Sequence, residues 1–205
     1  MATPVSHIAP FINVVFTITS HWWYERLDPV SGQVISLHRG LDIATPTNDP
    51  VYSMLSGHVH SKGYDGSQGN WIIIMDDNPS SAFYGYATLY MHLRDSSILN
   101  TGSPVSQNQL VGYEGTTGHS TGIHLHVEMQ DISRFNWQWH VSSTKSDYLD
   151  PTAFMGIDNI DYTQWIYDGS PYNPPPVIKE RSKFPWVLYA RKFRERNWQK
   201  IKKIL

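Results

Sequence analysis

Apolar and polar side chains alternate along Ile123-His124-Leu125-His126-Val127-Glu128-Met129. This period of two predicts a β-strand, and residues two apart on a strand share a face. His124 and His126 are therefore expected side by side. Imidazole is the commonest metal ligand in proteins, so one ring can hold zinc while the other moves a proton next to it. The stretch indicates a metal-dependent hydrolase, provided that further ligands exist.

Short segments rich in β-branched and aromatic residues recur through residues 11–130, with turn clusters of Gly, Pro, Asn and Asp between them. The main predicted strands cover residues 34–37, 51–54, 57–60, 71–75, 86–91, 109–113 and 123–129. Helical periodicity is nearly absent before residue 150. The pattern predicts an all-β core, built as an antiparallel β-sandwich or a partly open barrel.

Composition and charge divide the chain. Its 205 residues, 40% of them hydrophobic and 17% charged, suit one domain with appendages. Residues 1–175 contain six Lys and Arg against sixteen Asp and Glu, a balance of −10, whereas residues 176–205 contain ten against two, a balance of +8. We predict a core domain over residues 1–156, a Pro-rich linker over residues 157–176 and a basic amphipathic helical tail over residues 177–205.

The chain has no cysteine, so any metal site must use His, Asp or Glu. A catalytic zinc takes three protein ligands and keeps one position open for water. His38 and Asp42 directly follow the predicted strand over residues 34–37. Together with one histidine of the His124/His126 pair, they would complete a His/Asp/His set with a free fourth position.

Other histidines compete for these roles. His58 and His60 form a second pair separated by one residue, and spacing alone does not choose between it and His124/His126. His92 stands at the end of a predicted strand, where a histidine is usually structural or merely exposed.

Three motifs, in this order, resemble those of the M23 (lysostaphin/LytM-like) zinc endopeptidases. They are HRGLD at residues 38–42, YMHL at residues 90–93 and GTTGHSTGIHLHVE at residues 115–128. The stretches GNWIII at residues 69–74 and GSPVSQNQLVG at residues 102–112 are similar to further family segments. The resemblance covers roughly residues 18–156 and implies the LytM fold, which is of the duplicated hybrid motif type.

The resemblance also implies roles for individual residues. His38, Asp42 and His126 match the ligands of a single Zn²⁺ ion, whereas His124 and His92 match two unligated histidines that flank it. His124 would act as general base, and His92 would bind the same water or stabilise the oxyanion, although the two roles could be exchanged. His58 and His60 match no functional position.

The implied substrate is the peptide part of bacterial peptidoglycan, either cross-bridge or stem, so the enzyme would act outside the cell at the wall. No export signal or membrane span is evident in the sequence. We therefore expect a phage enzyme that is either virion-associated or released at lysis, or one module of a longer chain. The basic tail would dock on a phage structural protein or an anionic wall polymer, or lie at a membrane surface. Its Trp186, Tyr189 and Phe193 could equally pack on the core domain while the charges face water. No nucleic-acid partner is predicted. The alternative is a non-catalytic wall-binding or structural virion module of the same fold.

Overall fold

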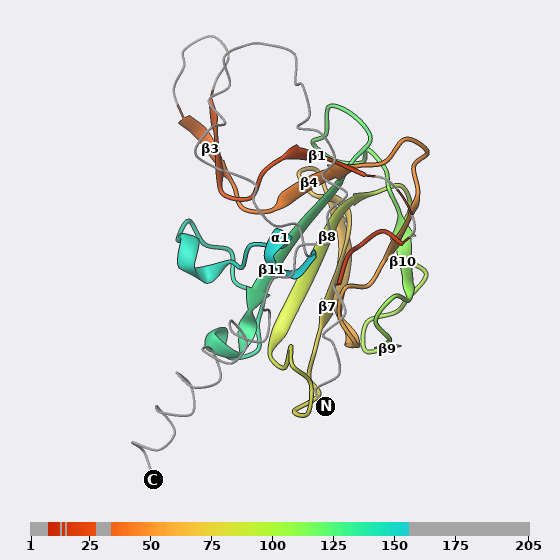
Figure 1. The fold of residues 1–205 in the computed structure, drawn as a ribbon, viewed down its shortest axis with the longest axis vertical. Coiled ribbons are helices and arrows are strands. Elements are labelled where there is room, and N and C mark those ends of the chain that lie inside the picture. The colour runs from red at the N-terminus through yellow and green to blue at the C-terminus, as the bar shows by residue number, and fades with distance from the viewer. Residues whose placement is uncertain (1–7, 13, 15, 28–33, 156–205) are drawn as a thin grey trace, which may run out of the picture. The chain divides into compact units, whose positions relative to one another are not determined.

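The computed structural model describes residues 8–12, 14, 16–27 and 34–155 (Figure 1). The linker and the tail predicted over residues 157–205 lie outside these described residues. The described part consists mainly of antiparallel β-strands, which confirms the predicted all-β core. No helix within it is long and apolar enough to cross a membrane.

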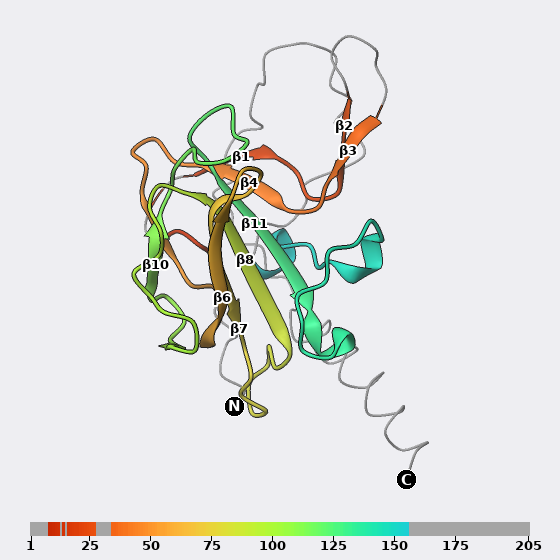
Figure 2. The same ribbon diagram turned by 180° about the vertical axis from the view of Figure 1, so that it is seen from behind.

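Seven strands form one sheet in which segments far apart in the sequence are neighbours (Figure 1; Figure 2). In order across the sheet they are β1 (Thr17–Ser20), β4 (Leu41–Ala44), β11 (Leu125–Asp131), β8 (Tyr86–Leu93), β7 (Gly69–Met75), β6 (Gly57–Asp65) and β9 (Pro104–Val105). Every pair of neighbours is antiparallel. In the described residues β1 and β9 remain edges, so the sheet stays open and forms no closed barrel.

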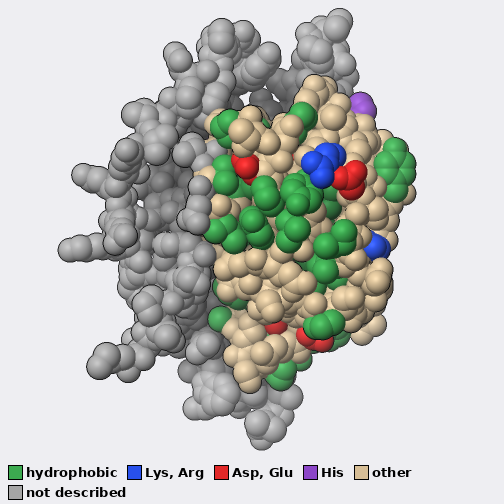
Figure 3. Space-filling view, turned by 90° about the vertical axis from the view of Figure 1, so that its right-hand side faces the viewer, with side chains coloured by type: hydrophobic (Ala, Val, Ile, Leu, Met, Phe, Trp, Pro, Cys, Tyr) green, Lys and Arg blue, Asp and Glu red, His purple; other side chains and the backbone are tan. Residues whose placement is uncertain are grey.

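Smaller elements complete the described part of the fold. Two-stranded sheets join β2 (Tyr24–Leu27) to β3 (Val34–His38) and β5 (Pro50–Tyr52) to β10 (Leu110–Tyr113). Three short helical turns follow β11: η1 (Ile132–Phe135), η2 (Lys145–Asp147) and α1 (Thr152–Met155). The side of the molecule that carries β10 presents a patch of apolar side chains with few charges (Figure 3). Apolar surface of this kind is ordinary on folded domains, and we assign it no function.

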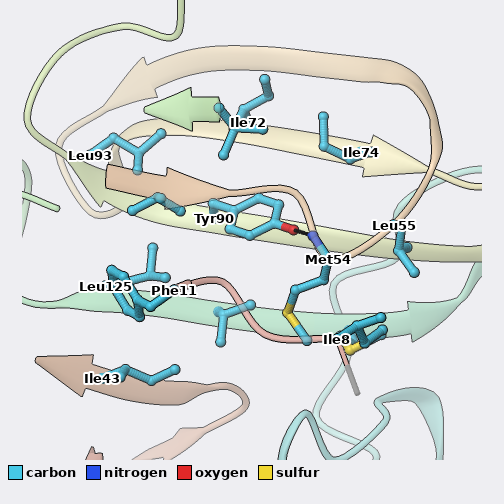
Figure 4. Close-up of a cluster of buried hydrophobic side chains, with 14 of the residues drawn as sticks. Ile8, Phe11, Ile43, Met54, Leu55, Ile72, Ile74, Tyr90, Leu93 and Leu125 are labelled. Atoms are coloured by element: carbon cyan, nitrogen blue, oxygen red, sulfur yellow. Dashed lines mark hydrogen bonds between the residues drawn. The ribbon is translucent and has the colours of Figure 1, made fainter. Parts of the chain in front are cut away.

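One face of the large sheet is covered by the main hydrophobic core (Figure 4). Leu125, Val127 and Met129 of β11 are fully buried there, as the period of two requires. Tyr90 of β8 is fully buried as well, and its hydroxyl oxygen accepts a hydrogen bond from the backbone N–H of Met54 at 2.7 Å (Figure 4). Burial raises the pKa of this phenol, which therefore stays neutral and anchors the segment after β5 to the core.

The opposite face of the sheet carries the polar residues of β11. His126 lies across from Met91 of β8 and Glu128 across from Leu89, so these four side chains share that face. Met91 and Leu89 belong to a second buried apolar cluster, against which the partly buried Trp71, Trp137 and Trp139 pack. His126 and Glu128 therefore lie next to this second apolar cluster on the same face of the sheet.

The predicted strand over residues 123–129 is displaced by two residues. β11 begins at Leu125, where it starts to pair with β4 at Ile43. His124 lies just before the strand and forms an isolated bridge with Gly115, and the side chain of Ile123 is 44% exposed. The shift arises because β4 and β8 offer their first pairing partners only from Leu125 and His126 onward.

Candidate metal centre

Three strands bring His38, Asp42 and His126 together. His38 is the last residue of β3, Asp42 is the second residue of β4, and His126 lies directly across from Asp42 on β11. The turn between β3 and β4 passes very close to β11. A Cβ atom added to Gly40 would lie 2.5 Å from both the His126 ring and the Val127 carbonyl oxygen, so only glycine fits there.

The ligand atoms of the three residues converge. Asp42 Oδ1 lies 2.9 Å from His38 Nε2 and 2.7 Å from His126 Nδ1, and the two ring nitrogens are 3.0 Å apart. All three residues are buried. Among the described residues, this is the one group of three or more His, Cys, Asp or Glu side chains that could hold a metal ion.

Contacts on the far side of each ring determine which nitrogen faces the centre. The Nδ1–H group of His38 donates to the carbonyl oxygen of His21 at 2.7 Å. The Nε2–H group of His126 donates to Glu128 Oε1 at 3.1 Å. In their neutral forms the two rings therefore present lone pairs, from His38 Nε2 and His126 Nδ1, toward a carboxylate oxygen. Three lone pairs at such short separations require a cation between them.

The ionisation of the metal-free cluster reflects this requirement. Burial by itself lowers the pKa of His126, but hydrogen bonds to Asp42 and Glu128 outweigh it and raise the pKa to about 9. Burial also acts to raise the pKa of Asp42, yet the hydrogen bonds to His126 and His38 hold it well below its usual range. Without a metal, a proton on His126 thus supplies the positive charge.

His124 and His92 complete a group of four imidazoles. His124 Nε2 lies 3.7 Å from Asp42 Oδ1, and its Nδ1–H group donates to the carbonyl oxygen of Gly122 at 2.9 Å. The His92 ring centroid is 4.8 Å from that of His124 and 6.1 Å from that of His126. All five residues singled out in the sequence therefore meet in one place.

His92 reaches the centre through an irregularity in β8. Residues 90 and 93 pair with residues 72 and 70 of β7, so Met91 and His92 together stand opposite Trp71 alone. His92 adopts a left-handed backbone with φ of 60°. Such a bulge changes the direction of a side chain. Regular alternation would point His92 into the core, and the bulge points it to the face that carries His126. The Nδ1–H group of His92 donates to the carbonyl oxygen of Thr117 at 2.8 Å, and burial lowers the pKa of the ring to about 4.

The competing pair lies elsewhere. His58 Nδ1 forms an ion-pair contact with Asp77 at 3.0 Å, and His60 Nδ1 contacts the hydroxyl of Ser61 at 3.1 Å. Neither histidine belongs to the converging group. Residue spacing missed two members of the surroundings, Glu128 and Arg39. For Glu128 a signal existed, because it follows His126 by two residues on the same strand face.

Comparison with known proteins places this geometry in a family. The model of peptidase family M23 matches residues 36–141, which is half of the chain. The chain is 37% identical over 111 residues to the peptidoglycan DD-endopeptidase ShyC of Vibrio cholerae, an overlap of 54% of this chain and 24% of that protein. It is 35% identical over 115 residues to the DD-carboxypeptidase/endopeptidase Mpg of Neisseria gonorrhoeae, with 56% and 25% covered. The chain thus spans about a quarter of the length of these curated relatives.

Solved structures show the same fold. A zinc-containing peptidase from Vibrio cholerae matches with a TM-score of 0.50 and 31% identity, over 66% of this chain and 35% of that one. The catalytic domain of lysostaphin from Staphylococcus simulans matches with a TM-score of 0.50 and 24% identity, over 70% and 92% of the two chains. The predicted LytM-like fold is thereby confirmed. The family model matches residues 36–141, half of the chain, and this match shows that the chain belongs to peptidase family M23.

Proposed function

We propose that this chain is a zinc-dependent endopeptidase that hydrolyses peptide bonds in bacterial peptidoglycan. The observation that carries the proposal is the convergence of His38 Nε2, Asp42 Oδ1 and His126 Nδ1, with His92 and His124 next to them. Membership of a peptidase family supports it, as do relatives named peptidoglycan DD-endopeptidases.

The three ligands suit zinc in chemistry and in spacing. Donor atoms around a tetrahedral zinc lie about 3.3 Å apart, because each bond is about 2.0–2.1 Å long. The separations of 2.7, 2.9 and 3.0 Å found here are close to that value. When bound, the ion would supply Lewis acidity, which polarises a carbonyl oxygen and lowers the pKa of a coordinated water to about 7.

His124 is placed to accept a proton. Because its Nδ1–H group donates to the Gly122 carbonyl, its Nε2 carries a lone pair, and this atom lies on the side of Asp42. A histidine in this state can take a proton from the attacking water and pass it to the leaving amine. We therefore assign the role of general base to His124.

His92 has a related but narrower role. Its Nδ1–H group is held by the Thr117 carbonyl, so the neutral ring offers only an acceptor at Nε2. An acceptor can orient a water molecule, but it cannot donate to an oxyanion. Of the two roles predicted for His92, this hydrogen bond favours the binding of water.

Digestion of peptidoglycan tests the proposal. The purified full chain, loaded with zinc, is incubated with peptidoglycan from species with different cross-links, and new amino termini are identified by mass spectrometry. We expect new peptide termini that disappear with a chelator and return when zinc is restored. If the zinc-loaded protein produces no new peptide termini from any of these walls, the assignment as an enzyme is wrong. The alternative of a non-catalytic wall-binding module would then stand. The phage setting and the docking role of residues 177–205 stay predictions.

A further inference from the structure

Arg39 stands in the turn between two metal-site residues, yet the proposed chemistry does not use it. Its side chain is 34% exposed, and Nε lies 3.6 Å from Glu128 Oε1. Its guanidinium carbon lies 5.9 Å from the centre of the Tyr148 ring. Among the described residues, the Arg39 guanidinium forms this one ion pair and this one cation–π contact, and it forms no hydrogen bond. A guanidinium has five N–H donors, so most of its binding capacity is open.

Neighbouring groups hold the guanidinium at the edge of the centre. Glu128 is buried and binds both Arg39 and the outer nitrogen of His126. Tyr148 is held in turn, because its hydroxyl accepts a hydrogen bond from the backbone N–H of Ser142 at 3.0 Å. One imidazole and one carboxylate separate Arg39 from the converging ligand atoms. The span from the Arg39 guanidinium to these ligand atoms corresponds to at most about three residues of extended peptide, at about 3.3–3.6 Å per residue.

The charges around Arg39 are unbalanced in favour of an anion. With a divalent ion bound and the histidines neutral, the ion and Arg39 carry three positive charges, whereas Asp42 and Glu128 carry two negative ones. The group therefore has a net charge of about +1, and it includes the planar, partly exposed guanidinium of Arg39. Such a fork pairs best with a carboxylate, which it can bind through two parallel hydrogen bonds.

We propose that Arg39 is a specificity-determining residue that binds a free carboxylate on the substrate, within about three residues of the cleaved bond. The inference rests on the proposed function and narrows its substrate class. The preferred substrates are cross-linked peptides that bear a carboxylate beside the scissile bond, and uncharged bridges such as glycine chains are poor substrates.

Matched peptides test the preference. Cross-linked peptides are prepared as pairs that differ only in a free carboxylate or a primary amide next to the scissile bond. One pair varies a main-chain terminal carboxylate and the other a side-chain carboxylate, so that the two sources are distinguished. For at least one pair we expect the acid to be cleaved with a kcat/KM about 10- to 100-fold higher, mainly through KM, as for a hydrogen bond between charged groups.

Variants assign the preference to Arg39. Arg39→Met keeps the apolar stem but removes the charge, and we expect the acid-to-amide ratio to fall to about one. Arg39→Lys retains the charge without the fork, so an intermediate ratio is expected. Arg134→Ala is the matched control, because Arg134 also lies over a ring, that of Phe135, but follows the far end of β11. It should keep the wild-type ratio.

The possible failures can be told apart. Equal cleavage of acid and amide in both pairs by the wild type would overturn the carboxylate site and leave the peptidase standing. Equal losses on acid and amide in Arg39→Met, with a reduced zinc content by mass spectrometry, would make Arg39 a support for Glu128 and also overturn the inference. No cleavage of the peptides or of whole peptidoglycan would overturn the proposed function itself.

Discussion

His126 and His92 arrive at the same centre from neighbouring strands, but by different means. On β11, regular alternation sends His126 and Glu128 to one face and Leu125 and Val127 into the core. On β8 the same rule would send His92 into the core, and a bulge with a left-handed residue turns it back. A regular strand thus supplies the proposed ligand and its hydrogen-bond partner, whereas a strained strand end supplies the residue that we propose binds the water.

The largest effect is expected from the regular strand. His126→Ala removes one of the three proposed ligands and one of the two histidine contacts of the buried Asp42 carboxylate, so zinc content and peptidase activity should both be abolished. Metal analysis and the peptidoglycan digest measure the two losses. His58→Ala is the control, since His58 lies on β6 and contacts Asp77 instead. Full activity in His126→Ala would refute the ligand assignment.

A substitution in the β8 bulge should affect catalysis without affecting zinc binding, unlike His126→Ala. His92→Ala leaves all three ligands in place, so the protein should still bind zinc, whereas its kcat should fall about 10²- to 10⁴-fold through loss of the residue that orients the water. Zinc titration and kcat measured on one preparation separate the two properties. If zinc binding fell together with kcat, the contrast between the two strands would fail.

Glu128 tests how much the alternation of β11 contributes beyond the ligand itself. Glu128→Gln keeps an acceptor for the Nε2–H group of His126 but removes the charge, and we expect zinc affinity to fall about 10- to 100-fold. The matched control is Glu114→Gln, because Glu114 is equally buried but binds Thr45. Competition with a chelating dye measures both, and equal losses in the two variants would indicate a general effect of burying a glutamine.

The smallest effect concerns protons. Because the pKa of His126 is raised to about 9 in the metal-free protein, this ring is protonated at pH 7 and must lose its proton when zinc binds. Calorimetry in buffers of different ionisation enthalpy should show about one proton released per ion from this ring, and affinity should rise about tenfold per pH unit below pH 9. If zinc binding at pH 7 releases no proton, His126 is not protonated in the metal-free protein and this prediction is wrong.

The same shift sets the pH dependence of the metal-free fold. The folded pKa of about 9 lies above the ordinary 6.5, so the protonated ring contributes stability that is fully present below pH 6.5. This contribution is lost as the pH rises through about 9. Thermal unfolding of chelated protein between these pH values should follow that direction, whereas zinc-loaded protein should not.

Much of the centre could be predicted before the fold was known. His38 and Asp42 lie four residues apart after a strand, and the alternation around His126 names a face, so local patterns and family resemblance were sufficient for the cluster. The start of β11 could not be predicted, because it depends on where β4 and β8 offer partners. The packing of Trp137 and Trp139 on the second apolar cluster was equally hidden, since it joins distant segments.

Residue type and a period of two were enough to predict the all-β class and to exclude cysteine ligands. The five central residues needed the family resemblance as well, because spacing alone did not separate His124 and His126 from His58 and His60. Three features emerge only in the folded chain: the ring nitrogens that face the centre, the return of His92 to the site face, and the link that Glu128 makes between His126 and Arg39. These features arise from pairing between strands and from polar contacts that include a pair of residues 88 positions apart, and such contacts leave no local pattern in the sequence.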